Sequence, residues 1–214
     1  MSDEPAPAQA ADEEVRRLFF AVLLPRPLQA AAEVVQRALK RANADIKWVE
    51  PEHLHFTLKF LGDTAMAAVP ELIEVGREVA ARTPRTRVML RALGGFPHDQ
   101  WPQAVWIGCD TGGPELAKLG QELDTALAEA GLAPLDKRPF TPHLTLGRAR
   151  SNRRLKGLVE TLAKYATVDI GPLLLVSFAL MSSQLGPEGP TYEVIQEFPL
   201  CPPADRTGGT TPSV

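Results

Sequence analysis

The chain has 214 residues, and its 23 Lys and Arg against 26 Asp and Glu give a formal net charge of −3. No apolar run approaches the roughly 20 residues that a membrane-spanning helix needs, and the acidic N-terminus lacks the basic and apolar regions of a secretory signal peptide. We therefore expect a cytoplasmic protein with no membrane contact. The two cysteines, Cys109 and Cys201, are too few for a disulfide framework or a four-cysteine zinc site.

Both ends of the chain have the composition of disordered tails. Residues 1–14 hold five acidic side chains and no basic one, and residues 201–214 are rich in Pro, Gly and Thr. Such segments bury too little apolar surface to offset the entropy of ordering. The remaining residues, 15–200, are expected to form a single domain, and their 22 basic and 20 acidic side chains make this folded part mildly basic.

Helical and strand periodicities alternate along the folded range. We expect the strand that begins near residue 54 to be closed by a turn at Gly62-Asp63. The alternation indicates an α/β or α+β protein. In chain order the pattern predicts a strand at 17–24, a helix at 27–43, strands at 46–49 and 54–61, a helix at 67–82, strands at 86–93 and 104–109, a helix at 114–130, a strand at 143–148, a helix at 151–165 and two final strands at 168–181 and 191–198.

A short sequence motif occurs twice. One predicted strand carries His55-Phe56-Thr57-Leu58 and another carries His143-Leu144-Thr145-Leu146, with the two histidines 88 residues apart. Each copy belongs to a comparable block of strand, helix and strand. The repeat therefore predicts two lobes that are related by an internal pseudo-twofold axis.

The residue types of the repeated motif suit acid/base chemistry on a phosphate ester. Successive side chains of a strand alternate faces, so the His and the Thr of each copy point the same way. One imidazole can act as a base and the other as an acid, because histidine titrates near neutral pH. The threonine hydroxyls would donate hydrogen bonds to the non-bridging phosphate oxygens. This arrangement requires no metal, and the spacing leaves open which histidine is the acid.

Other readings of the histidines and cysteines compete with this one. A single His-x-Thr in a strand is typical of a structural histidine, and only the duplication favours catalysis. His53, His55 and His143 would suit a three-histidine zinc site, but the threonines would then have no role. We interpret His53 as a surface or turn residue, His98 as a solvated loop residue and Cys109 as a packed apolar side chain.

The second motif lies within a basic run. Residues 137–156 hold seven Lys and Arg and no acid, which raises the expectation of phosphate or RNA contact beyond that of an ordinary solvated face. Arg148 follows His143 by five residues and would face the opposite way in a regular strand, unless a strand end or a bulge turns it back. Phe60 and Phe140 are core residues by default, although at a cleft rim they would stack on a base.

With both motifs and their surroundings, the sequence resembles the two-histidine phosphoesterases. Within them it resembles the RNA 2′,3′-cyclic phosphodiesterases of bacteria and archaea, historically named 2′–5′ RNA ligases. The resemblance extends from about residue 16 to residue 200. It is carried by RLFFAVLLP at 17–25, KWVEPEHLHFTLKFLGD at 47–63, GGFP at 94–97, VWIG at 105–108, RPFTPHLTLGR at 138–148 and TYEVIQEFPL at 191–200.

The resemblance implies a bilobal α+β fold, in which two pseudo-symmetric lobes of antiparallel sheet with outer helices surround a central cleft. It also implies hydrolysis of an RNA 2′,3′-cyclic phosphate to a 2′-phosphomonoester, with no cofactor and no metal. His55 would be the proton donor and His143 the proton acceptor. Thr57, Thr145 and Arg148 would bind the phosphate.

The expected partner is RNA with a 2′,3′-cyclic phosphate end, or a small cyclic nucleotide. Ligation through a 2′–5′ bond would use the same histidines with a 5′-hydroxyl in place of water. The alternative from another class is a non-catalytic module that binds RNA ends or nucleotides, although mere binding would not need two titrating imidazoles. We expect a monomer, because two pseudo-symmetric lobes need no partner chain to complete the site.

Overall fold

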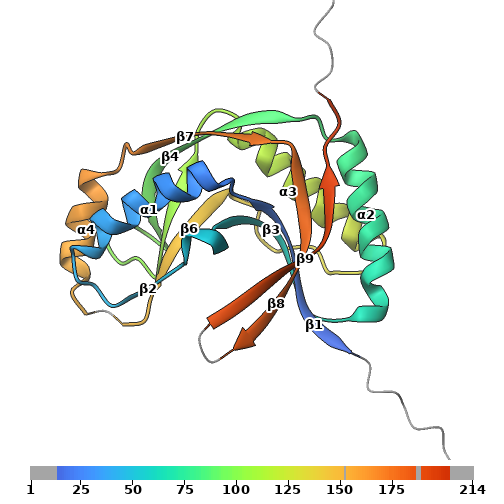
Figure 1. Cartoon of the computed structure of the whole chain (residues 1–214), viewed down its shortest axis with the longest axis horizontal. Coiled ribbons are helices and arrows are strands. Elements are labelled where there is room, and N and C mark those ends of the chain that lie inside the picture. The colour runs from blue at the N-terminus through green and yellow to red at the C-terminus, as the bar shows by residue number, and fades with distance from the viewer. Residues whose placement is uncertain (1–13, 152, 187–188, 203–214) are drawn as a thin grey trace, which may run out of the picture.

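The protein folds into two antiparallel sheets, as seen in a computed structural model that describes residues 14–151, 153–186 and 189–202 (Figure 1). Residues 1–13 and 203–214, which hold most of the two expected tails, lie outside the described residues. Cys201, at the start of the second expected tail, is among the described residues, and its N–H donates to the carbonyl of Thr83 at 3.0 Å. Among the residues described, no helix is both long and apolar enough to cross a membrane.

The first sheet has four strands and the second has five. Every pairing between neighbouring strands is antiparallel. The four-stranded sheet has the order β3 (His55–Ala65), β1 (Val15–Leu23), β8 (Ser177–Gly186) and β9 (Gly189–Pro199). The five-stranded sheet has the order β2 (Ile46–Trp48), β6 (His143–Ala149), β5 (Ala104–Cys109), β4 (Thr86–Phe96) and β7 (Asp169–Leu175).

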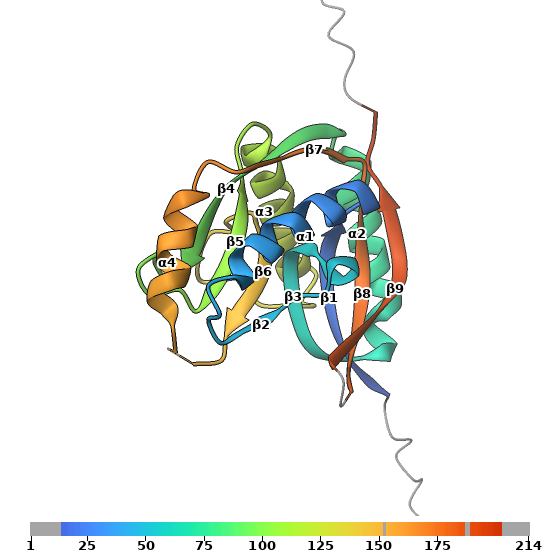
Figure 2. The same ribbon diagram turned by 60° about the vertical axis from the view of Figure 1, so that its left-hand side comes forward.

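In the described part of the chain, four α-helices pack outside the sheets in two pairs. α1 (Arg26–Lys40) contacts α4 (Leu155–Lys164) and β7, whereas α2 (Val69–Arg82) contacts α3 (Gly113–Glu129), β8 and β9. Figure 2 shows α1 and α4 on the side of the five-stranded sheet. Two 3₁₀ turns, η1 (Pro51–His53) and η2 (Met66–Ala68), complete the assignment. The expected α+β architecture of two antiparallel lobes with outer helices is therefore confirmed.

The buried face of each helix follows from its apolar spacing. On α1 the buried side chains include Leu28, Ala32, Val35 and Leu39, which recur every three or four residues. They join one continuous hydrophobic core that both sheets share. The two lobes are therefore held together by a common interior, which keeps their inner faces in a constant relation.

The expected ends of several strands are wrong: the strand predicted at 86–93 extends to Phe96, and two others differ more deeply. The strand of the first motif continues past Gly62-Asp63 to Ala65, because Gly62 adopts a φ of 76° and stays paired with Leu18. This residue marks an irregularity within the strand rather than a turn. The predicted strand 168–181 is two strands that separate at Val176. An unbroken apolar run conceals this break, because the chain passes there from the five-stranded sheet into the four-stranded one.

The sheet register confirms the internal repeat. The last residue of β1, Leu23, lies opposite His55, and Gly108 near the end of β5 lies opposite His143. Both motifs thus begin at the same place in a pair of antiparallel strands. β3 and β6 also contact each other where the two sheets meet, so the two copies face a common space.

Candidate active site

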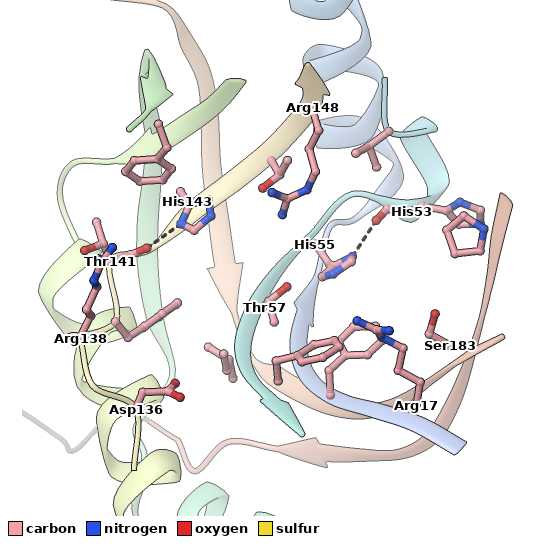
Figure 3. A pocket seen from close by; sticks show the side chains of 18 of the residues that line it. Arg17, His53, His55, Thr57, Asp136, Arg138, Thr141, His143, Arg148 and Ser183 are labelled. Atoms are coloured by element: carbon pink, nitrogen blue, oxygen red, sulfur yellow. Dashed lines mark hydrogen bonds between the residues drawn. The ribbon is translucent and has the colours of Figure 1, made fainter. Parts of the chain in front are cut away.

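An open cleft of about 1250 Å³ lies where the two sheets meet, and both repeated motifs line it (Figure 3). Its walls come from strands and loops of both lobes. The residues that line it include Arg17, Phe19, His53, His55, Thr57, Phe60, Phe96, Asp136, Lys137, Arg138, Phe140, Thr141, His143, Thr145, Arg148 and Tyr192. All seven site residues expected from the sequence are therefore part of one cleft.

The two histidines have the same hydrogen-bonded arrangement. Nδ1 of His55 lies 2.7 Å from the carbonyl oxygen of His53, and Nδ1 of His143 lies 2.8 Å from the carbonyl oxygen of Thr141. A carbonyl can only accept a hydrogen bond, so Nδ1 carries the proton in both rings. Nε2 is then the atom of each ring that can take up or release a proton in the cleft (Figure 3).

Burial favours the neutral form of both histidines in the free protein. Burial lowers the pKa of His55 below 6.5, against the opposing effect of the hydrogen bond to His53. Burial also lowers the pKa of His143, and the positive charge of Arg148 adds to this effect, while the hydrogen bond to Thr141 opposes it. An anion bound between the rings would have the opposite influence, because it favours the charged imidazolium.

A one-residue bulge follows each threonine. On β6, Val105 pairs with Gly147 and Trp106 pairs with Thr145, so Leu146 has no opposite residue. The same irregularity on β3 leaves Leu58 without a partner. An extra residue shifts the alternation of side chains by one position.

Each bulge turns the side chain two residues further along its strand toward the cleft. After Leu146 the exposed side chain of Arg148 lies on the cleft side with His143 and Thr145. After Leu58 the corresponding position is occupied by Phe60, which is 47% exposed and also lines the cleft. The pseudo-twofold thus relates a cation at one end of the site to an aromatic ring at the other.

The two phenylalanines expected at the rim differ in their anchoring. Phe60 is covered by Arg17, whose guanidinium carbon lies 4.6 Å from the ring centroid. Phe140 packs against Gly120 of α3, where the methyl group of an alanine would collide with the ring. One edge of Phe140 is therefore part of the core, whereas Phe60 presents its ring to the cleft.

Several cleft residues were not expected from the sequence. Tyr192 approaches His55 edge-on with ring centroids 5.5 Å apart, and Phe96 approaches His143 edge-on at 4.9 Å. Phe19 lies 5.1 Å from His55. These residues fall within the segments RLFF, GGFP and TYEV that carried the family resemblance. That resemblance was the one sequence signal that could have indicated them as cleft residues. Arg17, which also lines the cleft, is the first residue of RLFF and had the same signal, although no local pattern links β1 to the motifs.

The remaining titratable candidates have structural surroundings. His53 closes the η1 turn, and its ring packs edge-on against Tyr192 at 4.9 Å. His98 is exposed and is absent from the cleft lining. Burial raises the pKa of the Cys109 thiol to about 12, so this residue is not a thiolate nucleophile at neutral pH. Among the described residues no three His, Cys, Asp or Glu side chains form a group that could hold a metal.

Two His-x-Thr strands that face one cleft across a pseudo-twofold define the two-histidine phosphoesterase class of fold. A family model described as the 2′-5′ RNA ligase superfamily matches residues 24–182. The chain belongs to this superfamily, which confirms the resemblance drawn from the motifs.

The curated relatives extend over most of the chain. The RNA 2′,3′-cyclic phosphodiesterase of Aquifex aeolicus is 38% identical over 170 residues, which cover 78% of this chain and 90% of that protein. The protein of the same name from Methanothermobacter thermautotrophicus is 34% identical over 185 residues, which cover 86% and 98% of the two chains.

Solved structures show the same fold. The crystal structure of TT0787 of Thermus thermophilus superposes with a TM-score of 0.72 at 30% identity and covers 86% of this chain and 97% of that one. The E. coli LigT structure without ligand superposes with a TM-score of 0.70 at 24% identity, covering 87% and 98%. The second likeness concerns the fold alone.

Proposed function

We propose that this protein hydrolyses RNA 2′,3′-cyclic phosphodiester ends to 2′-phosphomonoesters. In this reaction the oxygen of water forms a bond to phosphorus, and the bond from phosphorus to O3′ breaks. His143 takes a proton from the water at Nε2, and His55, which is protonated at both Nδ1 and Nε2 once the anionic substrate is bound, gives its Nε2 proton to the departing O3′. The products are a 2′-phosphomonoester and a free 3′-hydroxyl.

The observation that carries this proposal is the paired geometry of the imidazoles. Two histidines lie in one cleft, and each donates its Nδ1 proton to the carbonyl of the residue two positions earlier. This fixes both rings with Nε2 available, which a structural or merely binding histidine would not require on both strands. The relatives named RNA 2′,3′-cyclic phosphodiesterase support the same chemistry.

The other cleft residues would bind the substrate. Thr57 and Thr145 would donate hydrogen bonds to the non-bridging oxygens, and the guanidinium of Arg148 would add a charge-assisted hydrogen bond. The ring of Phe60, and more weakly that of Phe140, would stack on a base, which is worth roughly 1–3 kcal/mol per base. The burial that lowers the pKa of both histidines supports a neutral base before substrate arrives.

The test is hydrolysis of RNA that ends in a 2′,3′-cyclic phosphate, with EDTA present. His55→Ala and His143→Ala should each lose roughly 10²–10⁴-fold in kcat, which is the usual contribution of one positioned proton transfer. His98→Ala is the matched control, because His98 is exposed and lies outside the cleft. Loss of wild-type activity on chelation, or full activity in either cleft variant, would contradict the mechanism.

The same variants can assign the two roles. A p-nitrophenyl phosphodiester has a leaving group that departs without a proton, so it bypasses the general acid. His55→Ala should therefore recover most of its activity on this ester, whereas His143→Ala should remain slow. The reverse result would exchange the acid and the base and leave the two-histidine chemistry intact.

The rival functions share this site. With a 5′-hydroxyl in the place of water, the same residues would catalyse 2′–5′ ligation. If only cyclic mononucleotides are hydrolysed, the substrate is a small molecule and not RNA. We further propose a monomeric protein of the cytoplasm. Both His-x-Thr motifs belong to this chain and line one cleft, so the site needs no partner chain to complete it.

A further inference from the structure

Gln36 is a polar side chain in the apolar face of α1. It is 0% exposed and lies on the same buried stripe as Leu28, Ala32, Val35 and Leu39. A buried amide is tolerated only when its hydrogen bonds are made. The position would otherwise favour an apolar residue, so the partners of this amide indicate what it does.

Both partners of the Gln36 amide are backbone carbonyls. Nε2 donates to the carbonyl oxygen of Val49 at 2.7 Å and to that of Leu146 at 2.9 Å, while Oε1 has no hydrogen-bond partner in the described part of the chain. The reverse orientation of the amide would bring three oxygens together, so the donor must face these carbonyls. Both N–H groups of the Gln36 amide thus donate to backbone carbonyls, whereas its oxygen accepts no hydrogen bond from the described residues.

Leu146 is the bulged residue that turns Arg148 into the cleft. It has no opposite residue on β5, and its carbonyl instead accepts the N–H of Val49 at 2.9 Å in addition to the amide of Gln36. If β6 returned to regular pairing here, the alternation of faces would move Arg148 to the side opposite His143 and Thr145. The conformation that places Arg148 therefore depends on what holds the Leu146 carbonyl.

We propose that Gln36 is a positioning residue for Arg148, which it serves by holding the Leu146 bulge from behind the sheet. The inference rests on the proposed function only in taking Arg148 as a phosphate ligand. Gln36 lies on α1, is fully buried and is not among the residues that line the cleft, so it acts on the site only through β6. Its contribution is to keep the guanidinium at the phosphate before substrate binds.

The contact between Gln36 and a bulge occurs at only one of the two ends that the pseudo-twofold relates. The equivalent bulge at Leu58 is followed by buried Lys59, which bonds to Asp124 and Asp136 and has no contact with Gln36. Loss of the Gln36 amide should therefore affect Arg148 and leave the Phe60 end of the cleft in place.

The experiment measures the dissociation constant of inorganic phosphate by calorimetry at fixed pH and salt. Arg148→Ala should weaken binding about tenfold or more, as expected for a lost charge-assisted hydrogen bond. Gln36→Met, which keeps the length and removes both donors, should weaken binding about fivefold through misplacement of that ligand. In the double variant the effect should equal that of Arg148→Ala alone, because both changes remove the same interaction.

A matched control separates positioning from stability. Val35→Ala removes a buried side chain from the same helix without touching the bulge, so it should lower the melting temperature and leave phosphate binding unchanged. If Gln36→Met does not fold, Gln36→Asn keeps the amide but shortens its reach, and the same weakening is expected.

The outcomes distinguish the two proposals. Normal phosphate binding by folded Gln36→Met, or an effect that adds fully to that of Arg148→Ala, would overturn the role of Gln36 and leave the proposed function standing. Normal binding by Arg148→Ala would overturn the role of Arg148 as a phosphate ligand, and the role of Gln36 with it.

Discussion

At the scale of single residues, the chemistry of the cleft depends on how two imidazoles are held. His55 and His143 each donate from Nδ1 to a carbonyl two residues earlier, at 2.7 and 2.8 Å. The spacing of His and Thr predicts a shared face, and the structure adds the tautomer. Burial, which no sequence pattern reveals, lowers the pKa of both rings.

Binding of an oxyanion should therefore be accompanied by proton uptake. The pKa of both histidines is lowered in the free protein, and an anion against Nε2 favours the protonated ring, so the complex holds more protons. Affinity should accordingly fall as the pH rises above the lowered pKa of the two rings in the free protein. The measurement is calorimetry with sulfate, whose own charge is constant over this rise in pH, in buffers of different ionisation enthalpy.

Variants identify the groups that take up the proton. His55→Gln and His143→Gln should each reduce the uptake, whereas His98→Gln should behave as the wild type because His98 is exposed outside the cleft. Sulfate binding without any change in protonation would show that neither imidazole becomes charged against the anion.

At the scale of elements, β3 and β6 do more than carry the motifs. The bulges after Thr57 and Thr145 turn the side chains that follow, so that Phe60 and Arg148 enter the cleft. On β3 the side chain between Leu58 and Phe60 points the other way. It is Lys59, which is 2% exposed and joins the strand to α3 and to the loop that leads to β6.

Lys59→Met should destabilise the fold strongly. Nζ of Lys59 lies 2.5 Å from Asp124 and 2.8 Å from Asp136, and it also donates to the carbonyl of Pro134. Burial lowers the pKa of Lys59, but the hydrogen bonds to the two carboxylates outweigh this and raise it. Removing the cation leaves these acceptors without their partner, which costs about 3 kcal/mol. Urea unfolding measures the loss.

An exposed ion pair on α3, the helix that carries Asp124, provides the comparison. Lys118 reaches Glu122 at 3.6 Å but is 75% exposed, so Lys118→Met should change the free energy of unfolding by less than about 1 kcal/mol. Equal effects of the two substitutions would show that the Lys59 cluster is no stronger than an exposed ion pair.

At the scale of the whole molecule, cations from distant parts of the chain meet at the cleft. Arg17 comes from β1, Arg148 from β6, and Lys137 and Arg138 from the loop before β6. The net charge of −3 conceals this, because five acids lie in residues 1–14. A polyanion larger than one nucleotide would therefore meet additional positive charge at the rim.

Binding of a short RNA that ends in a 2′-phosphate should weaken with salt more steeply than binding of a 2′-mononucleotide. Each additional phosphate contact contributes about −0.7 to the slope of log K against log salt for a single strand, so contacts from Lys137 and Arg138 would add about −1.4. The measurement is a salt titration of the dissociation constant by fluorescence anisotropy.

The double variant Lys137→Ala/Arg138→Ala should remove the difference between the two ligands. Arg77→Ala is its control, because Arg77 lies on α2 in a pair with Glu74 and is not among the cleft residues. Identical slopes for the oligonucleotide and the mononucleotide in the wild type would contradict phosphate contacts of the RNA chain with Lys137 and Arg138.

Periodicity and motif spacing are local properties of the chain, so they predict the alternation of strands and helices, the duplication and the two histidines with their threonines. Three features come from the folded chain alone: the division of 168–181 between two sheets, the entry of Arg148 and Phe60 into the cleft, and the approach of Arg17 and Tyr192 to it. They escape the sequence because an unpaired residue in a strand is defined only by its partner strand. Leu58 and Leu146 are ordinary leucines in the sequence, and only the register against β1 and β5 makes each of them a bulge.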